Sequence, residues 1–355
     1  MEVEQKLVDG IPLSFADGLA LYEQPLHYLG RLAHQQKIHR FGEGISYLRN
    51  YYMNFTNICH YACKYCGFRR NKRQADAYTL TIDAIAAKLQ KAPEDISEVW
   101  FSSGLNRELP FSYYTDLLKA VKQVLPKVHI KAFTAVEIDF FAQTFGQSHE
   151  KILDDLFAAG LDRIPGGGAE IFDESVREKI DIKTKTSDYL RIHRLCHERG
   201  VPTNITMLFG HIEERGQRIK HMLTLRDFQE QSGGVQAFIP LAFQDQNNPL
   251  AKQGVKGPSA VEILKTLAIS RILLHNIDHV QSFWVDTGEE LTQISLHYGV
   301  DDINGTLIEE NIAHQSGSPT KTYQPVDNLQ GWIRGAGFVP WERDIYFKPR
   351  QSSLP

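Results

Sequence analysis

The sequence predicts an α/β protein of the TIM type, a (β/α)8 barrel with an N-terminal helical cap and a C-terminal helical extension. Short β-rich runs alternate about eight times with longer amphipathic segments, which implies parallel strands joined by helical crossovers. The 355 residues suffice for such a barrel, about 250 residues long, with additions at both ends. A cysteine-rich stretch also follows the first barrel strand, where the reactive loops of a barrel begin. A doubly wound open sheet is the structural alternative.

The expected elements follow one another along a single structural domain. We expect a helical cap over residues 1–48, interrupted near Pro25, because apolar and charged residues there recur at helical spacing. We expect barrel strands within 49–305 at 51–57, 97–103, 128–134, 162–167, 203–210, 235–240 and 279–285, with a weaker eighth near 299–305. We expect helices between them at 79–91, 111–125, 149–159, 174–180, 186–199, 214–231, 258–275 and 288–297. Residues 306–355 should form one or two helices and an aromatic tail packed on the barrel.

The composition is that of an ordinary soluble globular protein, with 42% hydrophobic and 23% charged residues. The formal charge is −4 and there is no long basic block, so we expect no nucleic-acid or membrane partner and instead a small-molecule substrate. No run of about 18 apolar residues occurs, and the N-terminus does not resemble a secretory signal. We therefore expect a cytoplasmic location.

Three of the four cysteines lie in the stretch NFTNICHYACKYCGF, where Cys59, Cys63 and Cys66 have the spacing C-x3-C-x2-C. Cytoplasmic thiols stay reduced, so such a cluster more often binds metal than forms disulfides. Three thiolates can hold three corners of a [4Fe-4S] cluster, whereas a closed structural zinc site normally has four ligands. Zinc completed by His60, in a binding protein without catalysis, is the alternative. Cys196 lies in a helical segment and is expected to be a small core residue.

The cysteine spacing, followed by Gly67 and Phe68, resembles that of the radical S-adenosylmethionine enzymes. The stretches PGGGAEIF, TMLFGHIE and QAFIPLAF resemble a branch of that family which serves the futalosine route to menaquinone and deazaflavin synthesis. This resemblance implies a transferase with a [4Fe-4S] cluster that consumes S-adenosyl-L-methionine. It implies addition of the 5′-deoxyadenosyl radical to 3-[(1-carboxyvinyl)oxy]benzoate, with rearrangement and decarboxylation, to give 6-amino-6-deoxyfutalosine. Within the same branch, the alternatives are a dehypoxanthine futalosine cyclase and a deazaflavin synthase component that acts on tyrosine.

The resemblance also implies which residues hold the cofactor. Tyr65 lies within the cysteine motif, and Ser103 and Gly104 follow the second strand, where small residues let the backbone approach a ligand. Glu137 follows the third strand and is a further cofactor-binding candidate, although an acidic residue is also favourable in the first turn of a helix. A serine pair at 102–103 and Gly67 depart from the family's usual residues at these positions.

Two further pairs are candidates for the site. Glu170 and Arg177 follow the glycine run at 166–168, and Arg177 has the fork geometry that grips a carboxylate, although the pair could equally be a surface ion pair. His211 and Glu213 end the fifth strand in FGHIE, and strict alternation would point both side chains into the barrel mouth as catalytic residues. The alternative is that these two side chains make hydrogen bonds only within the protein and have no catalytic role.

A basic run at Arg69–Arg73 lies next to the cysteine motif. Such a run is usually a solvated face, but it could also attract an acidic electron donor such as flavodoxin or ferredoxin.

Overall fold

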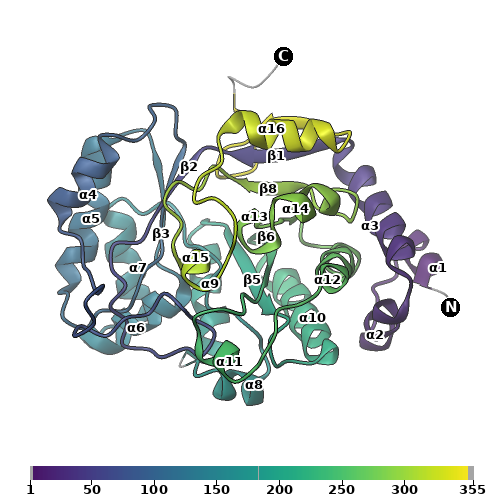
Figure 1. The fold of residues 1–355 in the computed structure, drawn as a ribbon, viewed down its shortest axis with the longest axis horizontal. Coiled ribbons are helices and arrows are strands. Elements are labelled where there is room, and N and C mark those ends of the chain that lie inside the picture. The colour runs from purple at the N-terminus through teal and green to yellow at the C-terminus, as the bar shows by residue number, and fades with distance from the viewer. Residues whose placement is uncertain (1–2, 183, 351–355) are drawn as a thin grey trace.

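The computed structural model describes residues 3–182 and 184–350, and within these ranges parallel strands alternate with helices. The predicted α/β class is therefore confirmed. Figure 1 shows β5 and β6 near the centre of the molecule, with α9 and α10 packed on β5 and α12 packed on β6. No helix in the described ranges is long and apolar enough to span a membrane.

The strands are short and pair in parallel. They are β1 Gly44–Leu48, β2 Asn50–Met53, β3 Glu98–Phe101, β4 His129–Ala132, β5 Thr203–Phe209, β6 Val235–Ala242, β7 His279–Val280, β8 Asp302–Gly305 and β9 Val339–Glu342. They form three three-stranded sheets with the orders β2-β3-β4, β5-β6-β7 and β8-β1-β9.

Isolated parallel bridges connect these sheets further around the molecule. Tyr51 pairs with Ile308, Lys131 with Arg163, and Gln281 with Asp302. In the described part of the chain, no ladder joins the Arg163 segment to β5, but the Leu208 amide donates to the Glu170 carbonyl over 2.8 Å. The expected strand at 162–167 is thus reduced to one bridge, because Pro165 has no amide proton and three glycines follow it.

The helices lie close to where the sequence places them. They are α1 Val3–Val8, α2 Phe15–Glu23, α3 Leu26–Phe41, α4 Ile82–Leu89, α5 Phe111–Val124, α6 Ala135–Phe145, α7 His149–Ala158, α8 Glu174–Lys179, α9 Thr186–Glu198, α10 Arg215–Ser232, α11 Pro249–Lys252, α12 Ala260–Leu273, α13 Trp284–Thr287, α14 Glu289–Ser295, α15 Ile312–Gln315 and α16 Val326–Gly335. The eight helices expected between the strands are all present. The sequence analysis did not anticipate α6, whose aromatic-rich sequence gives a weak helical signal, nor the one-turn helices α11 and α13.

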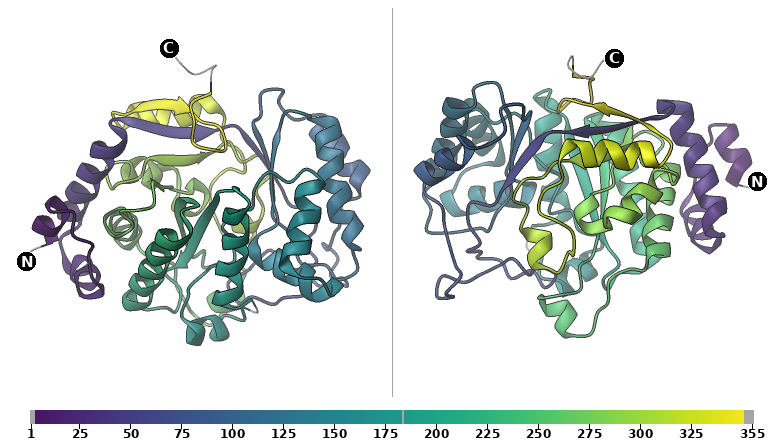
Figure 2. Two further views of the ribbon diagram at one scale, coloured as in Figure 1. Left: turned by 180° about the vertical axis from the view of Figure 1, so that it is seen from behind. Right: turned by 45° about the horizontal axis from the view of Figure 1, so that its top comes forward.

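The expectation of helix up to residue 48 is wrong for residues 44–48. Gly42, with φ of +59°, ends α3, and the next residues form β1. β1 pairs with β8 on one side and with β9 on the other, so strands from both ends of the chain complete one sheet. Figure 2 shows α16 lying beside β1, with α1–α3 along one flank of the molecule. The C-terminal extension therefore contributes a strand as well as helices.

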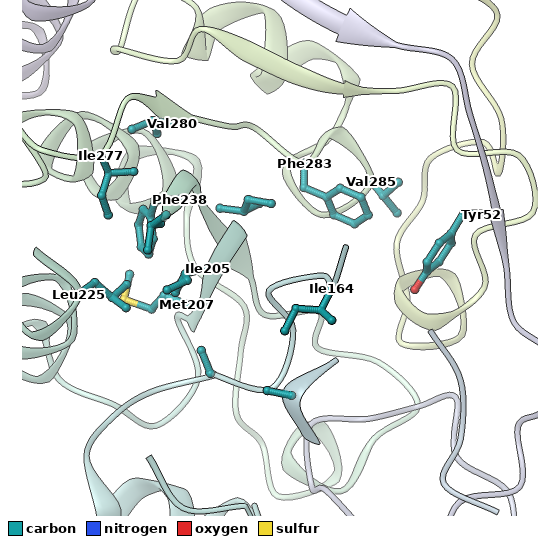
Figure 3. Packing of buried hydrophobic residues seen from close by; sticks show 14 of the residues in the cluster. Tyr52, Ile164, Ile205, Met207, Leu225, Phe238, Ile277, Val280, Phe283 and Val285 are labelled. Carbon is teal, nitrogen blue, oxygen red and sulfur yellow. The ribbon is translucent and has the colours of Figure 1, made fainter. Parts of the chain in front are cut away.

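The core is continuous from the strands to the surrounding helices. Figure 3 shows Ile205 and Met207 of β5 and Phe238 of β6 packed with Leu225 of α10. Burial of such side chains stabilises the fold by about 1.5–3 kcal/mol each. Cys196 of α9 is fully buried in this core, which confirms the expectation for it. An open cavity lies towards one end of the sheet assembly, where the cysteines are.

Candidate active site

The candidate site is a cavity of about 280 Å³ enclosed by the strands and the loops after them. Its lining includes all three motif cysteines, and it includes Tyr65, Ser103, Glu137 and Glu170 among the predicted cofactor residues. Side chains from β3, β4, β5 and β6 form its deeper part, whereas the cysteine loop and the segment before α15 form its mouth. This is the end of the strands where a parallel α/β protein binds its ligands.

Backbone hydrogen bonds hold the cysteine loop on both sides. The Cys59 amide donates to the Arg70 carbonyl over 3.1 Å, and the His60 amide donates to the Leu105 carbonyl over 2.8 Å. The Gly67 amide donates to Ser316 Oγ over 3.0 Å, and a Cβ at Gly67 would lie 2.5 Å from the Gln315 carbonyl oxygen. Glycine at position 67 therefore allows the turn after α15 to pack directly on the cysteine loop.

The three thiols suit an iron–sulfur cluster by their chemistry. Burial raises the pKa of Cys59 to about 11 and also raises the pKa values of Cys63 and Cys66. A metal centre supplies the positive charge that converts such thiols to thiolates. A cubane binds each of three thiolates to a different iron, so its sulfur ligands lie further apart than those of a single ion.

A single-ion zinc site fits less well. In residues 3–182 and 184–350, no three His, Cys, Asp or Glu side chains are grouped closely enough to hold one metal ion. His60, the expected fourth ligand, is exposed and is not part of the cavity lining. His60 therefore does not join the three cysteines on the cavity wall, which disfavours the Cys3His alternative.

Tyr65, Glu170 and Arg177 form one connected unit. The Tyr65 hydroxyl donates to Glu170 Oε1 over 2.8 Å, and burial raises the pKa of Glu170. Arg177 donates to the carbonyls of Ala169 (2.5 Å) and Ile171 (3.1 Å), the two residues that flank Glu170, and it does not line the cavity. Arg177 is thus placed to position Glu170, whose φ of +46° is an unusual backbone conformation for a glutamate.

Ser103 and Gly104 support the cysteine loop from β3. The Phe55 amide donates to Ser103 Oγ over 2.7 Å, and the Gly104 amide donates to the Thr56 carbonyl over 2.8 Å. A Cβ at Gly104 would lie 2.3 Å from the Ile58 carbonyl oxygen, one residue before Cys59. Ser103 lines the cavity whereas Gly104 does not. Because Gly104 has no side chain, its backbone can lie directly against the backbone of Ile58.

Glu137 has one oxygen engaged and one oxygen without a partner. Its Oε2 accepts from the Thr134 amide over 2.7 Å as part of the capping box that begins α6. Its Oε1 is buried and has no hydrogen-bond partner. Burial raises the pKa of Glu137 to about 7. The side chain is therefore both a helix cap and a free acceptor on the cavity wall.

His211 and Glu213 lie outside this cavity, against a separate hollow next to α10. Gly210, with φ of +84°, ends the extended chain, so the alternation assumed from the sequence does not continue beyond it. Glu213 accepts from the amides of Gly210 (2.5 Å) and His211 (2.9 Å) and from Arg218 Nε (2.6 Å). The pair is thus built into a structural turn, and the geometry does not support its predicted catalytic contact with a ligand in the main cavity.

The sequence analysis missed several polar residues on the cavity wall. Lys131 of β4 is the one Lys or Arg among the described lining residues; its Nζ lies 2.7 Å from Glu98 Oε1 and 4.1 Å from the centre of the Trp100 ring. Burial lowers the pKa of Lys131 to about 8 despite the neighbouring carboxylate. The single charge within the apolar run VHIKAF was a signal for it. The other missed polar lining residues include Asn204, Thr206, Gln281, Asp286, Asn304 and Glu310.

Comparison with known families gives two matches. Residues 53–225 match the Radical SAM superfamily, and residues 232–354 match the CofH/MqnC C-terminal region. The first range contains the three motif cysteines together with Glu137 and Glu170, and the second contains Asp286 and Glu310.

The curated relatives cover nearly the whole chain. An aminodeoxyfutalosine synthase of Streptomyces coelicolor is 42% identical over 98% of this chain and 93% of the relative. An aminodeoxyfutalosine synthase of Thermus thermophilus is 39% identical over 98% of this chain and 94% of the relative. A 5-amino-6-(D-ribitylamino)uracil–L-tyrosine 4-hydroxyphenyl transferase of Methanosarcina barkeri is 35% identical over 94% of this chain and 89% of the relative.

Among solved structures, methylornithine synthase matches with a TM-score of 0.75, covering 95% of this chain and 97% of that chain at 17% identity. At this identity the match concerns the fold, which is a TIM-type α/β fold.

Proposed function

Because this chain belongs to the radical SAM superfamily, we propose that it is a transferase with the activity for which its two bacterial relatives are named, that of an aminodeoxyfutalosine synthase. Its substrate would be 3-[(1-carboxyvinyl)oxy]benzoate and its product 6-amino-6-deoxyfutalosine, an intermediate of menaquinone biosynthesis. The main structural support for this proposal is that three cysteines and several buried polar side chains line one cavity.

The superfamily's cofactors are a [4Fe-4S] cluster and S-adenosyl-L-methionine, which together supply the 5′-deoxyadenosyl group in radical form. In this chain Cys59, Cys63 and Cys66 would bind the cluster, because all three line the cavity and their loop is anchored by backbone hydrogen bonds. Three cysteine ligands leave one iron free of protein ligands.

We propose that Tyr65, Ser103, Glu137 and Glu170 contact S-adenosyl-L-methionine. All four line the same cavity as the cysteines. Carboxylates can accept from the ribose hydroxyls or the methionine amine, and Glu137 Oε1 has no other partner. Arg177 would contribute indirectly, because it positions Glu170. Gly104 would also contribute indirectly, because it packs against the cysteine loop.

The deeper part of the cavity would bind the substrate. The proposed substrate carries two carboxylates, and the Lys131 ammonium is the cation that the described lining offers to one of them. Asn204, Gln281 and Asn304 line the same region and add hydrogen-bonding groups. Phe283 and Trp100, whose ring centroids are 6.2 Å apart, provide an apolar wall for the arene.

An acidic electron donor such as flavodoxin or ferredoxin would dock near the basic run after the cysteine motif. Arg70 pairs with Asp76 over 2.6 Å and Lys72 pairs with Glu108 over 2.6 Å. No ion pair is recorded for Arg69 or Arg73 within the described residues, so these two retain charge for a partner. We further propose a cytoplasmic location, where thiols stay reduced.

We also propose that the strands close into a complete barrel. The bridges at Tyr51, Lys131 and Gln281 extend the pairing around most of the ring. The hydrogen bonds from Leu208 to Glu170 and from Thr206 to Gly166 span the remaining gap.

The second candidate function is a transfer to or from tyrosine in deazaflavin synthesis, favoured by the 35% identity of the archaeal transferase. Anaerobic reactions with cluster-loaded protein, S-adenosyl-L-methionine and a reductant distinguish the two. A product with the mass of aminodeoxyfutalosine from 3-[(1-carboxyvinyl)oxy]benzoate supports the main proposal. If that substrate gives only 5′-deoxyadenosine while L-tyrosine with the ribitylaminouracil gives a product, the second candidate replaces it.

A further inference from the structure

The charge of the cavity is unexpected for an anionic substrate. Its described lining contains four carboxyl side chains and one ammonium group: Glu137, Glu170, Asp286, Glu310 and Lys131. If all four carboxyl groups were ionised, they would repel a ligand that carries two carboxylates. A carboxyl group in its neutral form would instead offer such a ligand a hydrogen-bond donor.

Asp286 has the surroundings that keep a carboxyl group neutral. It lies in the one-turn helix α13, just beyond β7, and lines the cavity. Its backbone is satisfied, since its amide donates to the Phe283 carbonyl (3.0 Å) and its carbonyl accepts from Gln244 Nε2 (3.0 Å). In residues 3–182 and 184–350, neither oxygen of its side chain has a recorded hydrogen bond or ion pair.

The groups that face Asp286 are themselves acidic. Glu310, before α15, and Glu170, after the Arg163 bridge, line the same cavity as Asp286 and act on it through like charge. Glu310 accepts from the Ala313 amide over 3.0 Å, and its other oxygen lies 2.7 Å from His314 Nδ1. Glu170 accepts from the Tyr65 hydroxyl. Glu310 and Glu170 thus each have a hydrogen-bond partner, whereas the Asp286 carboxyl group has none among the described residues and lies in the same cavity as these two acidic groups, which favours its neutral form.

We propose that Asp286 is a substrate-binding carboxylic acid, neutral in the resting cavity, which donates its proton in a hydrogen bond to a carboxylate of the substrate. This inference rests on the proposed function for the identity of the ligand. An O–H···O⁻ hydrogen bond is short and about twice as strong as a neutral one. The protonated Asp286 side chain therefore attracts the substrate carboxylate, which its ionised form would repel. Burial and the two neighbouring carboxylates raise the pKa of Asp286 well above its ordinary value, in agreement with this geometry.

The consequence is that substrate binding is linked to one proton. Above the pKa of Asp286, KM for 3-[(1-carboxyvinyl)oxy]benzoate should rise about tenfold per pH unit. The turnover of bound substrate should change much less, because the proton is held and not transferred. The other groups facing Asp286 are Glu310 with its partner His314, and Glu170, and substitution at 286 leaves all three in place.

Two substitutions test the proposal. Asp286→Asn keeps a hydrogen-bond donor but removes the titration, so KM should stay within a few-fold of wild type at neutral pH and become independent of pH. Asp286→Ala removes the donor and should raise KM more than tenfold. Asp327→Asn, at an exposed aspartate of α16, is the matched control and should leave the KM profile unchanged. An Asn variant that keeps the alkaline rise in KM, or an Ala variant with wild-type KM, overturns the proposal.

A substrate-free measurement separates this inference from the proposed function. The infrared difference spectrum of cluster-loaded wild type minus Asp286→Asn should contain the carbonyl band of a protonated carboxyl group at neutral pH. Absence of that band overturns the proposal whichever substrate the enzyme uses. If the band is present but wild type gives no aminodeoxyfutalosine, the protonated state of Asp286 is supported and the proposed function is wrong.

Discussion

Glu137 is the residue at which fold stability and cofactor binding meet. Its folded-state pKa is about 7, above the ordinary value of 4.5. Between these two pH values the unfolded chain loses a proton that the folded protein keeps, so folding stability should fall as pH rises from about 4.5 to 7 and then level off. A shift of this size corresponds to roughly 3 kcal/mol.

The test is Glu137→Gln, which removes the titration and keeps the size of the side chain. The free energy of unfolding of wild type, relative to this variant, should decrease by roughly 3 kcal/mol across that range in urea titrations. Glu290→Gln, at an exposed glutamate of α14, should run parallel to wild type. Parallel curves for Glu137→Gln as well would contradict the raised pKa.

The cysteine residues give a direct prediction. Replacing Cys59, Cys63 or Cys66 with alanine should abolish cleavage of S-adenosyl-L-methionine and lower the iron content, because in the proposed site each thiolate binds a different iron of the cluster. Cys196→Ala is the control: it lies in the core of α9 and should keep full iron content with a small loss of stability. Cleavage retained in any motif variant would refute the cluster assignment.

At the residue scale, the sequence could predict those parts of the site that are local in the chain. The cysteine motif, Tyr65, Ser103, Glu137 and Glu170 all face one cavity, because each lies next to a strand end or within one loop. His211 and Glu213 could not be placed, because the positive φ of Gly210 ends the alternation from which their direction was inferred. Lys131 and Asp286 acquire their significance only from neighbours distant in sequence.

At the element scale, the loop after β3 and the cysteine loop make a close backbone contact. Gly104→Ala should push Ile58 and Cys59 away from β3, since the added Cβ would lie 2.3 Å from a backbone oxygen. We expect a loss of about 1–3 kcal/mol in stability together with incomplete cluster loading, measured as thermal midpoint and iron content.

Gly331→Ala in α16 provides the matched control for this substitution. No atom lies within 4 Å of a Cβ at Gly331, so alanine should stabilise the helix by up to about 1 kcal/mol. Full iron content and wild-type stability in Gly104→Ala would show that the two backbones can separate without cost.

Element type was predictable where one periodicity dominates. Helices such as α5 and α10 have clear signals and were placed to within a few residues. The expected strand at 279–285 shrinks to β7, residues 279–280, because α13 begins at Trp284. β1 and β9 were not predicted as strands, because each is stabilised by pairing with a segment hundreds of residues away, a contact that no local pattern reveals.

At the scale of the whole molecule, a buried ionic network connects the C-terminal segment to the neighbouring strands. Arg343 binds Asp302, which also accepts from Ser46 Oγ over 2.6 Å and from Gln281 Nε2. Asp302 is fully buried. The network therefore links β1, β8, the bridge after β7 and the chain after β9.

Arg343→Met should destabilise the protein by about 3–5 kcal/mol, because it leaves the Asp302 carboxylate buried without its cation. Arg334→Met, at an exposed arginine of α16, should change stability by less than about 0.5 kcal/mol. Denaturant unfolding monitored by fluorescence and by circular dichroism should give one shared transition. Two separate transitions would show that residues after 306 fold independently of the barrel.

The position of β1 has a consequence for synthesis of the protein. Both neighbours of β1 in its sheet come from residues after 300, although β1 itself ends at Leu48. At about 5–20 residues per second, the ribosome needs on the order of 15–60 s to make the intervening chain. Throughout that time an apolar, strand-forming segment near the N-terminus has no partner to pair with. β1 can therefore pair only after residues beyond 300 have been made, and it is the segment that a chaperone has most reason to shield while translation proceeds.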